Sequence, residues 1–273
     1  MKKKSILSLA LAGVLTMGLI GCGSKNTADD KTIKIGVTPV PHREIVEHVI
    51  PALEEKGYTV EIVEFSDYVQ PNTSLEDGAL DANYFQTLAY LEEFNKKNGT
   101  HLVSASEIHV EPMGAYSYKY KSIDDIVSNE EKNAVLIPND PSNEARAFNV
   151  LVSAGLIKVK DGELITVADI TENPKNLQFK ELEAAQLPRA LDDIDIAVIN
   201  GNYALDADLD VTKDALFVED ENSQEMKARR NVLAIKEGNE SSEKIKDLIE
   251  VLTSDDVRTF IEKQYKGAVV PVF

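Results

Sequence analysis

Asn143 and Arg146 stand three positions apart at the start of a predicted helix, where they could bind a small anion. The apolar run 134–137 predicts a buried strand, and the prolines at 138 and 141 end it. Ser142 or Asn143 can cap a helix that continues over 145–154. Free backbone N–H groups at a helix start attract anions, and the planar arginine fork matches a carboxylate. This pattern favours a pocket for a small carboxylate such as an amino acid; a capped helix with a surface arginine is the alternative.

Two more strand–helix junctions, Phe65–Asn72 and Ile199–Tyr203, carry asparagine and tyrosine. In open α/β sheets ligands bind beyond the carboxyl ends of strands, so the three junctions are expected to converge. Asparagine both donates and accepts hydrogen bonds, and Tyr68, Tyr84 and Phe85 could line an apolar slot. Turn or cap roles for the asparagines and core packing for the aromatics are the competing interpretations.

Strand and helix patterns alternate along most of the chain, which predicts an α/β fold with mixed, mostly parallel sheets flanked by helices. The expected strands are 33–37, 58–65, 102–110, 113–118, 134–137, 177–182, 194–199, 215–218 and 232–235. The expected helices are 42–56, 87–98, 145–154, 183–191, 241–252 and 254–266.

Composition excludes several classes of function. The formal net charge of −18 over 273 residues argues against binding nucleic acid, and against attachment to anionic lipid through charge. The four histidines (His42, His48, His101 and His109) are scattered, and no His/Cys cluster has metal-ligand spacing. Neither a phosphate loop nor a G-x-S-x-G motif occurs. We therefore expect no metal and no cofactor.

The first 31 residues have the pattern of a targeting segment. Three lysines at positions 2–4 precede an apolar stretch at 6–20 that is too short to predict a spanning helix. It ends in Leu-Ile-Gly-Cys at 19–22, and Cys22 is the chain's only cysteine, which excludes an internal disulfide. This resembles a bacterial lipoprotein signal, which implies cleavage before Cys22, lipid on its sulfur and a place at the extracytoplasmic face of the cell membrane. An ordinary signal peptide is the alternative. Residues 1–21 are then the signal peptide and 22–31 a flexible tether.

Several blocks of sequence resemble the methionine-binding lipoproteins of the NlpA type, the substrate-binding components of ABC importers. The first two blocks are Phe65-Ser-Asp-Tyr-Val-Gln-Pro-Asn72 and Asp81-Ala-Asn-Tyr-Phe-Gln86. Similar blocks follow at 138–146, 184–191 with 197–203, and 265–271, in the family's order. The resemblance therefore covers residues 33–273.

The resemblance implies a two-lobed, periplasmic-binding-protein-like fold of type II that closes on its ligand. We expect residues 32–114 and 204–273 to form the first lobe and 115–203 the second, with crossings near Gly114 and Tyr203. The implied function is delivery of an amino acid, L-methionine above all, to permease and ATPase partners by a lipid-anchored monomer.

The family's pocket residues carry over position by position. Tyr68 and Phe85 are expected to face the ligand side chain, and Arg146 to pair with the α-carboxylate. Asn143, Asn200 and Asn231 are expected to bind the α-amino and α-carboxylate groups. Thr87 stands where members of the family often have histidine. A different apolar amino acid or a short methionine-containing peptide therefore stays open as the ligand.

Two other classes of function are compatible with parts of the sequence. An enzyme on this fold could use Asp67, Asp140 or Glu144 as acid or base, but no motif supplies a His, Lys or nucleophile partner. A surface lipoprotein or adhesin would share the segment around Cys22 but would not need Arg146 with three converging asparagines. The residue pattern favours a binding protein that is not an enzyme.

Overall fold

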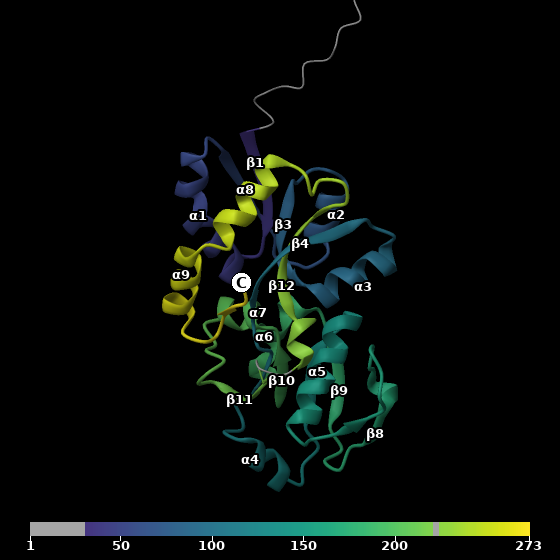
Figure 1. Ribbon diagram of the computed structural model, residues 1–273. Coiled ribbons are helices and arrows are strands. Elements are labelled where there is room, and N and C mark those ends of the chain that lie inside the picture. Colours follow the sequence, from purple (N-terminus) through teal and green to yellow (C-terminus); the bar gives the residue numbers. More distant parts are fainter. Residues whose placement is uncertain (1–30, 221–223) are drawn as a thin grey trace, which may run out of the picture.

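Two β-sheets, each with helices on both faces, make up the computed structural model, which describes residues 31–220 and 224–273 (Figure 1). The predicted signal peptide, Cys22 and residues 22–30 of the tether lie outside the described residues. The first sheet lies in the upper half of Figure 1 and the second in the lower half.

The first sheet combines the two ends of the described chain. Its strands, in spatial order, are β13 (Val270–Pro271), β4 (Leu102–Val110), β12 (Arg230–Lys236), β3 (Ala82–Thr87), β1 (Thr32–Val37) and β2 (Thr59–Glu64). β1 runs parallel to β2 and β3, whereas β12 runs antiparallel to β3 and β4. Helices α1 (Glu44–Glu55), α8 (Glu243–Leu252) and α9 (Asp255–Tyr265) cover one face, and α2 (Gln70–Glu76) and α3 (Leu88–Asn98) cover the other.

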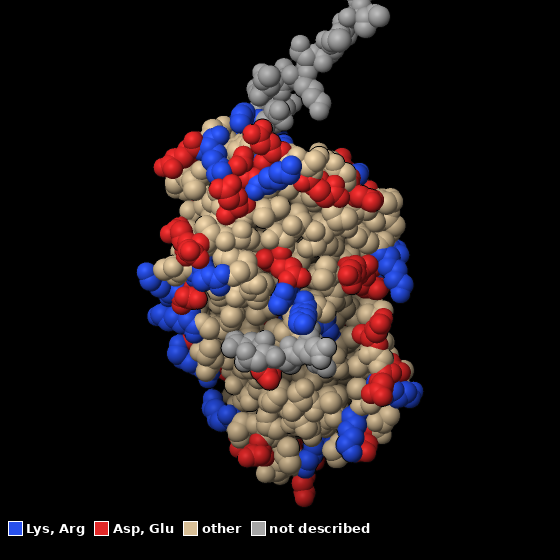
Figure 2. Space-filling view, in the orientation of Figure 1, with Lys and Arg blue, Asp and Glu red and all other residues tan. Residues whose placement is uncertain are grey.

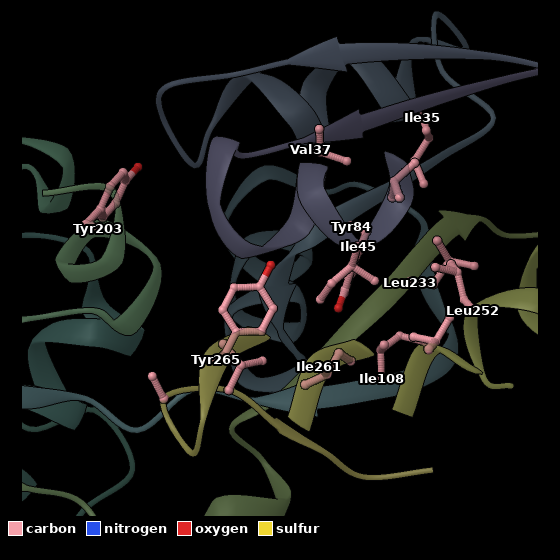
Figure 3. Packing of buried hydrophobic residues seen from close by; sticks show 14 of the residues in the cluster. Ile35, Val37, Ile45, Tyr84, Ile108, Tyr203, Leu233, Leu252, Ile261 and Tyr265 are labelled. Carbon is pink, nitrogen blue, oxygen red and sulfur yellow. The ribbon is translucent and has the colours of Figure 1, made fainter. Parts of the chain in front are cut away.

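Alternation along β1 builds the main core of this lobe. Ile33, Ile35 and Val37 are fully buried on one face, where they pack against Ile45 of α1 and Ile261 of α9 (Figure 3). Successive strand residues point to opposite faces, so a run with period two presents one apolar stripe to the helices. Burial of each such aliphatic side chain contributes about 1.5–3 kcal/mol, enough to hold the sheet that carries half of the candidate site.

The second sheet is formed by the middle of the chain. Its strands, in spatial order, are β11 (Ala215–Val218), β5 (Gly114–Tyr116), β10 (Ile196–Ile199), β6 (Ala134–Pro138) and β9 (Gln178–Leu182). Helix α5 (Pro141–Ser153) packs on one face, and α6 (Leu187–Ala190) and α7 (Gly201–Asp206) pack on the other. Helix α4 (Ile123–Ser128) and the pair β7 (Lys158–Val159) and β8 (Ile170–Glu172) lie at the far end of this lobe (Figure 1). Single helical turns occur at Pro39–Arg43, Val167–Asp169, Ala184–Gln186, Leu191–Asp193 and Gln224–Lys227.

Both sheets are mixed, as predicted, but they contain more antiparallel strand pairs than the prediction of mostly parallel strands allowed. β10, β6 and β9 run parallel, but β5 pairs antiparallel with β10 and with β11. In the first sheet β4, β12 and β13 are antiparallel additions to a parallel core. Apart from β13 at the C-terminal end, these antiparallel strands flank the two segments that pass between the lobes.

The chain crosses between the sheets at 111–113, after β4, and is back in the first sheet at β12, so it returns after β11 ends at Val218. The predicted return near Tyr203 is wrong, because Ala215–Val218 pairs with β5 and so belongs to the second lobe. The pattern of 215–218 showed a strand but could not show its partner, since pairing between distant strands leaves no local signal. As a result, both crossing segments lie beside the junctions that carry Arg146 and Asn200.

Charged side chains of both signs are interspersed over the face shown in Figure 2, without a broad patch of one sign. Among residues 31–220 and 224–273, the helices are all too short or too polar to span a bilayer.

Candidate ligand-binding site

A small pocket lies between the two lobes and brings together all seven of the predicted site residues. Its lining is Tyr68, Phe85, Gln86, Thr87, Tyr90, Glu111, Asn143, Arg146, Asn200, Gly201, Asn202 and Asn231. The first lobe supplies the aromatic residues with Gln86, Thr87 and Asn231, whereas α5 and the start of α7 supply Asn143, Arg146, Asn200, Gly201 and Asn202. The three strand–helix junctions therefore converge.

Asp140, rather than Ser142 or Asn143, caps helix α5. Its carboxylate accepts the backbone N–H of Asn143 at 2.9 Å, and Pro141 occupies the first helical turn. An aspartate before a proline is a favourable helix start, because proline needs no hydrogen-bond acceptor there. The cap fixes the first turn and so directs Asn143 and Arg146 toward the pocket.

Arg146 is buried, with 3% of its surface exposed, and is held by protein groups on one edge. Its Nε lies 2.9 Å from Glu219 Oε1, and its Nη2 donates to Glu219 Oε2 at 2.6 Å and to the Glu111 carbonyl at 2.7 Å. Burial alone would lower the pKa of Arg146, but the charge and hydrogen bonds of Glu219 outweigh burial and raise the pKa, so the guanidinium is charged. Nη1 has no hydrogen-bond partner among the described residues, which leaves two N–H donors for a ligand.

The asparagines of the second lobe form a chain that ends in an unsatisfied acceptor. Asn143 donates its amide to both oxygens of Asp140 at 3.0 Å, and its Oδ1 accepts the amide of Asn200 at 2.8 Å. Oδ1 of Asn200 is buried and has no hydrogen-bond partner within residues 31–220 and 224–273. A buried, unpaired carbonyl costs free energy, and an incoming N–H donor would remove that cost.

Asn231 is oriented by a buried network behind the pocket. His42 Nε2 lies 3.1 Å from Asn231 Oδ1, and Thr38 Oγ1 lies 2.8 Å from the other imidazole nitrogen of His42. Burial lowers the pKa of His42 to about 4, so the ring is neutral at pH 7 and carries its proton on Nε2 if the Thr38 hydroxyl donates. Because Oδ1 accepts from His42, the amide NH₂ of Asn231 remains to donate to a ligand oxygen.

The aromatic residues form the other end of the pocket. The ring of Tyr68 lies 5.8 Å from that of Phe85 and 5.6 Å from that of Tyr90, measured between centroids. Tyr68 also crosses the cleft, where it stacks on Tyr203 at 4.9 Å and donates its hydroxyl to Asn202 Oδ1. These contacts hold the two lobes together over the site.

Tyr84, which the sequence placed in the apolar slot, faces the core instead. It is fully buried and hydrogen-bonds His109 through its hydroxyl. Tyr84 and Phe85 are neighbours on strand β3, so their side chains point to opposite faces. Phe85 alone of the pair reaches the pocket.

Thr87 lines the pocket and also caps helix α3. Its hydroxyl accepts the backbone N–H of Tyr90 at 3.2 Å. The hydroxyl oxygen keeps its own O–H donor, but part of its accepting capacity is used by the helix start. Thr87 therefore adds no charge to the aromatic end of the pocket.

The amides of the first two sequence blocks bind one another. Gln86 exchanges hydrogen bonds with Asn72 at 2.6 and 2.7 Å, and Asn83 donates to Asn72 at 2.9 Å. All three are buried. This network fixes strand β3 to helix α2 and so positions Phe85 at the pocket, against the ring of Tyr68.

Two of the scattered histidines meet a carboxylate beside the pocket. His109 Nε2 lies 2.6 Å and His42 Nε2 3.3 Å from Glu111 Oε1, and all three residues are buried. Their ligand atoms lie within 4.8 Å of one another, close enough to hold a metal ion. Each imidazole nitrogen already has a protein partner, however, so the arrangement is satisfied as a hydrogen-bond network.

The carboxylates considered as acid or base have structural partners. Asp67 accepts the backbone N–H groups of Val69 and Gln70, and Asp140 caps α5. Glu144 lies on α5 outside the lining of the pocket; burial and the nearby charge of Glu181 raise its pKa to about 7. None of them is paired with a nucleophile or a histidine among the described residues.

Sequence reasoning missed Gln86, Tyr90, Glu111, Gly201 and Asn202 as lining residues, and Glu219 as the partner of Arg146. Gln86 lies in the sequence block 81–86 and Asn202 in the block 197–203. Their place in these blocks could have indicated that they line the pocket. Glu111 and Glu219 lie in the two crossing segments, and only the topology shows that these segments border the pocket.

A two-lobed α/β fold with a polar and aromatic pocket between the lobes defines the class of substrate-binding proteins. The model of one protein family, described as NlpA lipoprotein, matches residues 33–273. The chain therefore belongs to the NlpA lipoprotein family, as its sequence blocks predicted.

Named relatives and a solved structure extend this result. The D-methionine-binding lipoprotein MetQ of Yersinia pestis is 42% identical over 99% of this chain and 98% of its own length. The methionine-binding lipoprotein MetQ of Bacillus subtilis is 40% identical over 97% of this chain and 96% of its own. A nutrient-binding protein from Burkholderia cenocepacia, solved bound to methionine, superposes with a TM-score of 0.83 at 42% identity and covers 88% of this chain and 100% of its own.

Proposed function

We propose that this protein binds an amino acid, L-methionine above all, between its lobes and delivers it to the permease of an ABC importer. One observation carries the proposal: the pocket contains unsatisfied groups of both polarities, the Nη1 donors of Arg146 and the buried Oδ1 acceptor of Asn200. An α-amino acid carries a carboxylate and an ammonium on one carbon, which these two groups would satisfy together. The names of the relatives support methionine.

The polar end of the ligand would bind as follows. Arg146 Nη1 and the amide NH₂ of Asn231 donate to the α-carboxylate, and Asn200 Oδ1 accepts from the α-ammonium group. Asn143 serves indirectly, because its amide and Oδ1 are engaged by Asp140 and Asn200. A ligand lacking either charged group would leave a buried protein group unpaired.

The apolar end would take the ligand side chain between Tyr68, Phe85 and Tyr90, with Thr87 at the edge. A thioether packs well against aromatic rings and demands no hydrogen-bond partner. A charged or amide side chain would be desolvated there without compensation. This end of the pocket therefore supports an unbranched apolar amino acid.

Delivery would depend on closure of the two lobes. Tyr68 joins the lobes through Asn202 and Tyr203, so ligand contacts made from both sides favour the closed state. A diacyl anchor at Cys22, outside the described residues, would hold the protein at the membrane beside its permease and ATPase partners. We expect a monomer to perform this role.

Calorimetry of the full-length chain in detergent, unfolded and refolded to remove any ligand retained during purification, tests the proposal. L-Methionine should bind more tightly than any other standard amino acid, and D-methionine is included because some relatives are named for it. Arg146→Ala should lower the affinity about 100-fold or more, as expected for loss of a buried charge-assisted contact. Arg189→Ala, at an exposed arginine, is the matched control.

Binding of a different amino acid would correct the ligand and keep the class. A methionine-containing dipeptide that binds more tightly than methionine would identify a peptide carrier. No binding of any amino acid or dipeptide would overturn the proposal.

A further inference from the structure

We propose that Glu111 is a further ligand residue, whose carboxylate pairs with the α-ammonium group of the bound amino acid. This inference rests on the proposed amino-acid binding. Glu111 lies in the first crossing segment between the lobes, lines the pocket, and has 5% of its side chain exposed.

The position of Glu111 relative to Arg146 fits the two charges of an amino acid. The Glu111 carbonyl accepts a hydrogen bond from Arg146 Nη2 at 2.7 Å, so Glu111 directly adjoins the predicted carboxylate-binding group. In an α-amino acid the ammonium and the carboxylate are joined through one carbon. An anionic group adjoining Arg146 in the same pocket is therefore suitably placed for the ammonium.

Glycine at position 201 leaves room for this carboxylate. A Cβ atom there would lie 2.7 Å from Glu111 Cβ and 3.1 Å from its Oε2, closer than packed atoms approach. Glu111 thus packs against the turn 200–202, which also carries the unpartnered Oδ1 of Asn200. Two acceptors on one side of the pocket suit an ammonium group, which donates three hydrogen bonds.

The groups that donate hydrogen bonds to the Glu111 carboxylate, His109 and the backbone N–H of Asn202, carry no charge. His109 Nε2 lies 2.6 Å from Oε1, and the hydroxyl of Tyr84 binds the opposite nitrogen of that ring. Burial lowers the pKa of His109 to about 3 and that of His42 to about 4, so both rings are neutral at pH 7. Neutral donors hold the carboxylate in place but leave its charge available to a cation.

Burial raises the pKa of Glu111, and the charge of Arg146 offsets this only in part, because Glu219 takes the hydrogen bonds of Arg146 Nε and Nη2. A bound ammonium group would favour the charged form of Glu111 further. With ligand bound, the charges would alternate: Glu219 negative, Arg146 positive, ligand carboxylate negative, ligand ammonium positive, Glu111 negative. Each buried charge then has a neighbour of opposite sign, which is the condition for burying charges at tolerable cost. The site would thus select zwitterions over simple carboxylic acids.

The test compares two ligands on two proteins. Full-length wild type and Glu111→Gln, freed of ligand by unfolding and refolding, are titrated with L-methionine and with 4-(methylsulfanyl)butanoic acid, which lacks only the amino group. Glu111→Gln should weaken L-methionine binding about 30- to 100-fold, yet change binding of the des-amino acid by less than about threefold. The preference of the protein for L-methionine over the des-amino acid would therefore be largely lost. Glu237→Gln, at an exposed position after β12, should leave both affinities unchanged.

Gly201→Ala provides a second variant, because the added methyl group displaces the Glu111 carboxylate without removing it. It too should reduce the preference for methionine. Equal weakening of both ligands in the two variants would make Glu111 a positioning residue for Asn231 and overturn this inference while leaving the proposed function intact. An unchanged methionine affinity in Glu111→Gln would overturn it as well. Failure of wild type to bind methionine would instead count against the proposed function.

Discussion

The guanidinium of Arg146 forms a two-pronged ion pair with the carboxylate of Glu219, with Nε 2.9 Å from Oε1 and Nη2 2.6 Å from Oε2. Arg146 belongs to helix α5, and Glu219 directly follows β11 in the return crossing. Glu219 also accepts the backbone N–H of Met113 at 2.7 Å, in the other crossing segment. One carboxylate therefore links the proposed ligand carboxylate site to both connections between the lobes.

Glu219→Gln should lower the free energy of unfolding by about 3 kcal/mol, because it leaves the buried charge of Arg146 without its counter-ion. Urea denaturation at pH 7 measures the effect. The exposed control Glu237→Gln should stay within about 0.5 kcal/mol of wild type. If Glu219→Gln and Glu237→Gln have the same free energy of unfolding, the ion pair contributes nothing to the stability of the fold.

Thr87→Ala should destabilise the protein by about 1 kcal/mol, because the side chain of Thr87 accepts the Tyr90 N–H at the start of α3. Thr87→Ser keeps the hydroxyl and should keep most of the stability. Methionine affinity, measured by calorimetry, should change less than about threefold in either variant, the limit for a site that loses only an apolar contact. A large loss of affinity at unchanged stability would assign the hydroxyl to the ligand instead of the helix.

Asn231→Asp should weaken methionine binding about 100-fold or more, and more than Asn231→Ala does, because an oxygen replaces the NH₂ that faces the ligand carboxylate. Asn231→Ala removes the donor without adding repulsion, so about tenfold weaker binding is expected. Asn239→Asp adds the same charge at an exposed position and serves as the control. Tighter binding by Asn231→Asp than by Asn231→Ala would mean that Asn231 accepts from the ligand ammonium.

Glu144→Gln should change the free energy of unfolding in a more stabilising direction at pH 8 than at pH 5. Burial, assisted by the charge of Glu181, raises the pKa of Glu144 from 4.5 to about 7, so the folded state binds its proton more tightly than the unfolded state does. The stability contributed by that proton is present below pH 4.5 and is lost as the pH rises through about 7. The wild type should therefore lose about 1 to 2 kcal/mol relative to Glu144→Gln between pH 5 and pH 8, with solvent screening reducing the full linkage value.

Urea denaturation of both proteins at the two pH values gives this difference. Glu181→Gln removes the neighbouring charge and should reproduce a part of it. A stability difference between wild type and Glu144→Gln that does not change with pH would contradict the raised pKa.

Local patterns were sufficient for much of the fold. Ile33, Ile35 and Val37 share one buried face of β1, as a period of two predicts, and Thr87 precedes a helix whose first turn needs an acceptor. The helix after Pro141 was also expected, although Asp140 caps it instead of Ser142 or Asn143. Such features depend on residues a few positions apart, whose interactions hold in any tertiary context.

The sequence, through the family that it resembles, was enough to predict the family, the three strand–helix junctions and seven of the twelve residues that line the pocket. Only the tertiary structure decided that Glu219 pairs with Arg146, that His42 and His109 meet Glu111, and that residues 215–218 belong to the second lobe. These contacts join residues on separate segments of the chain, across strand pairings and lobe crossings. Periodicity and capping report on neighbours along the chain, whereas these contacts depend on which strands pair and where the chain crosses between sheets.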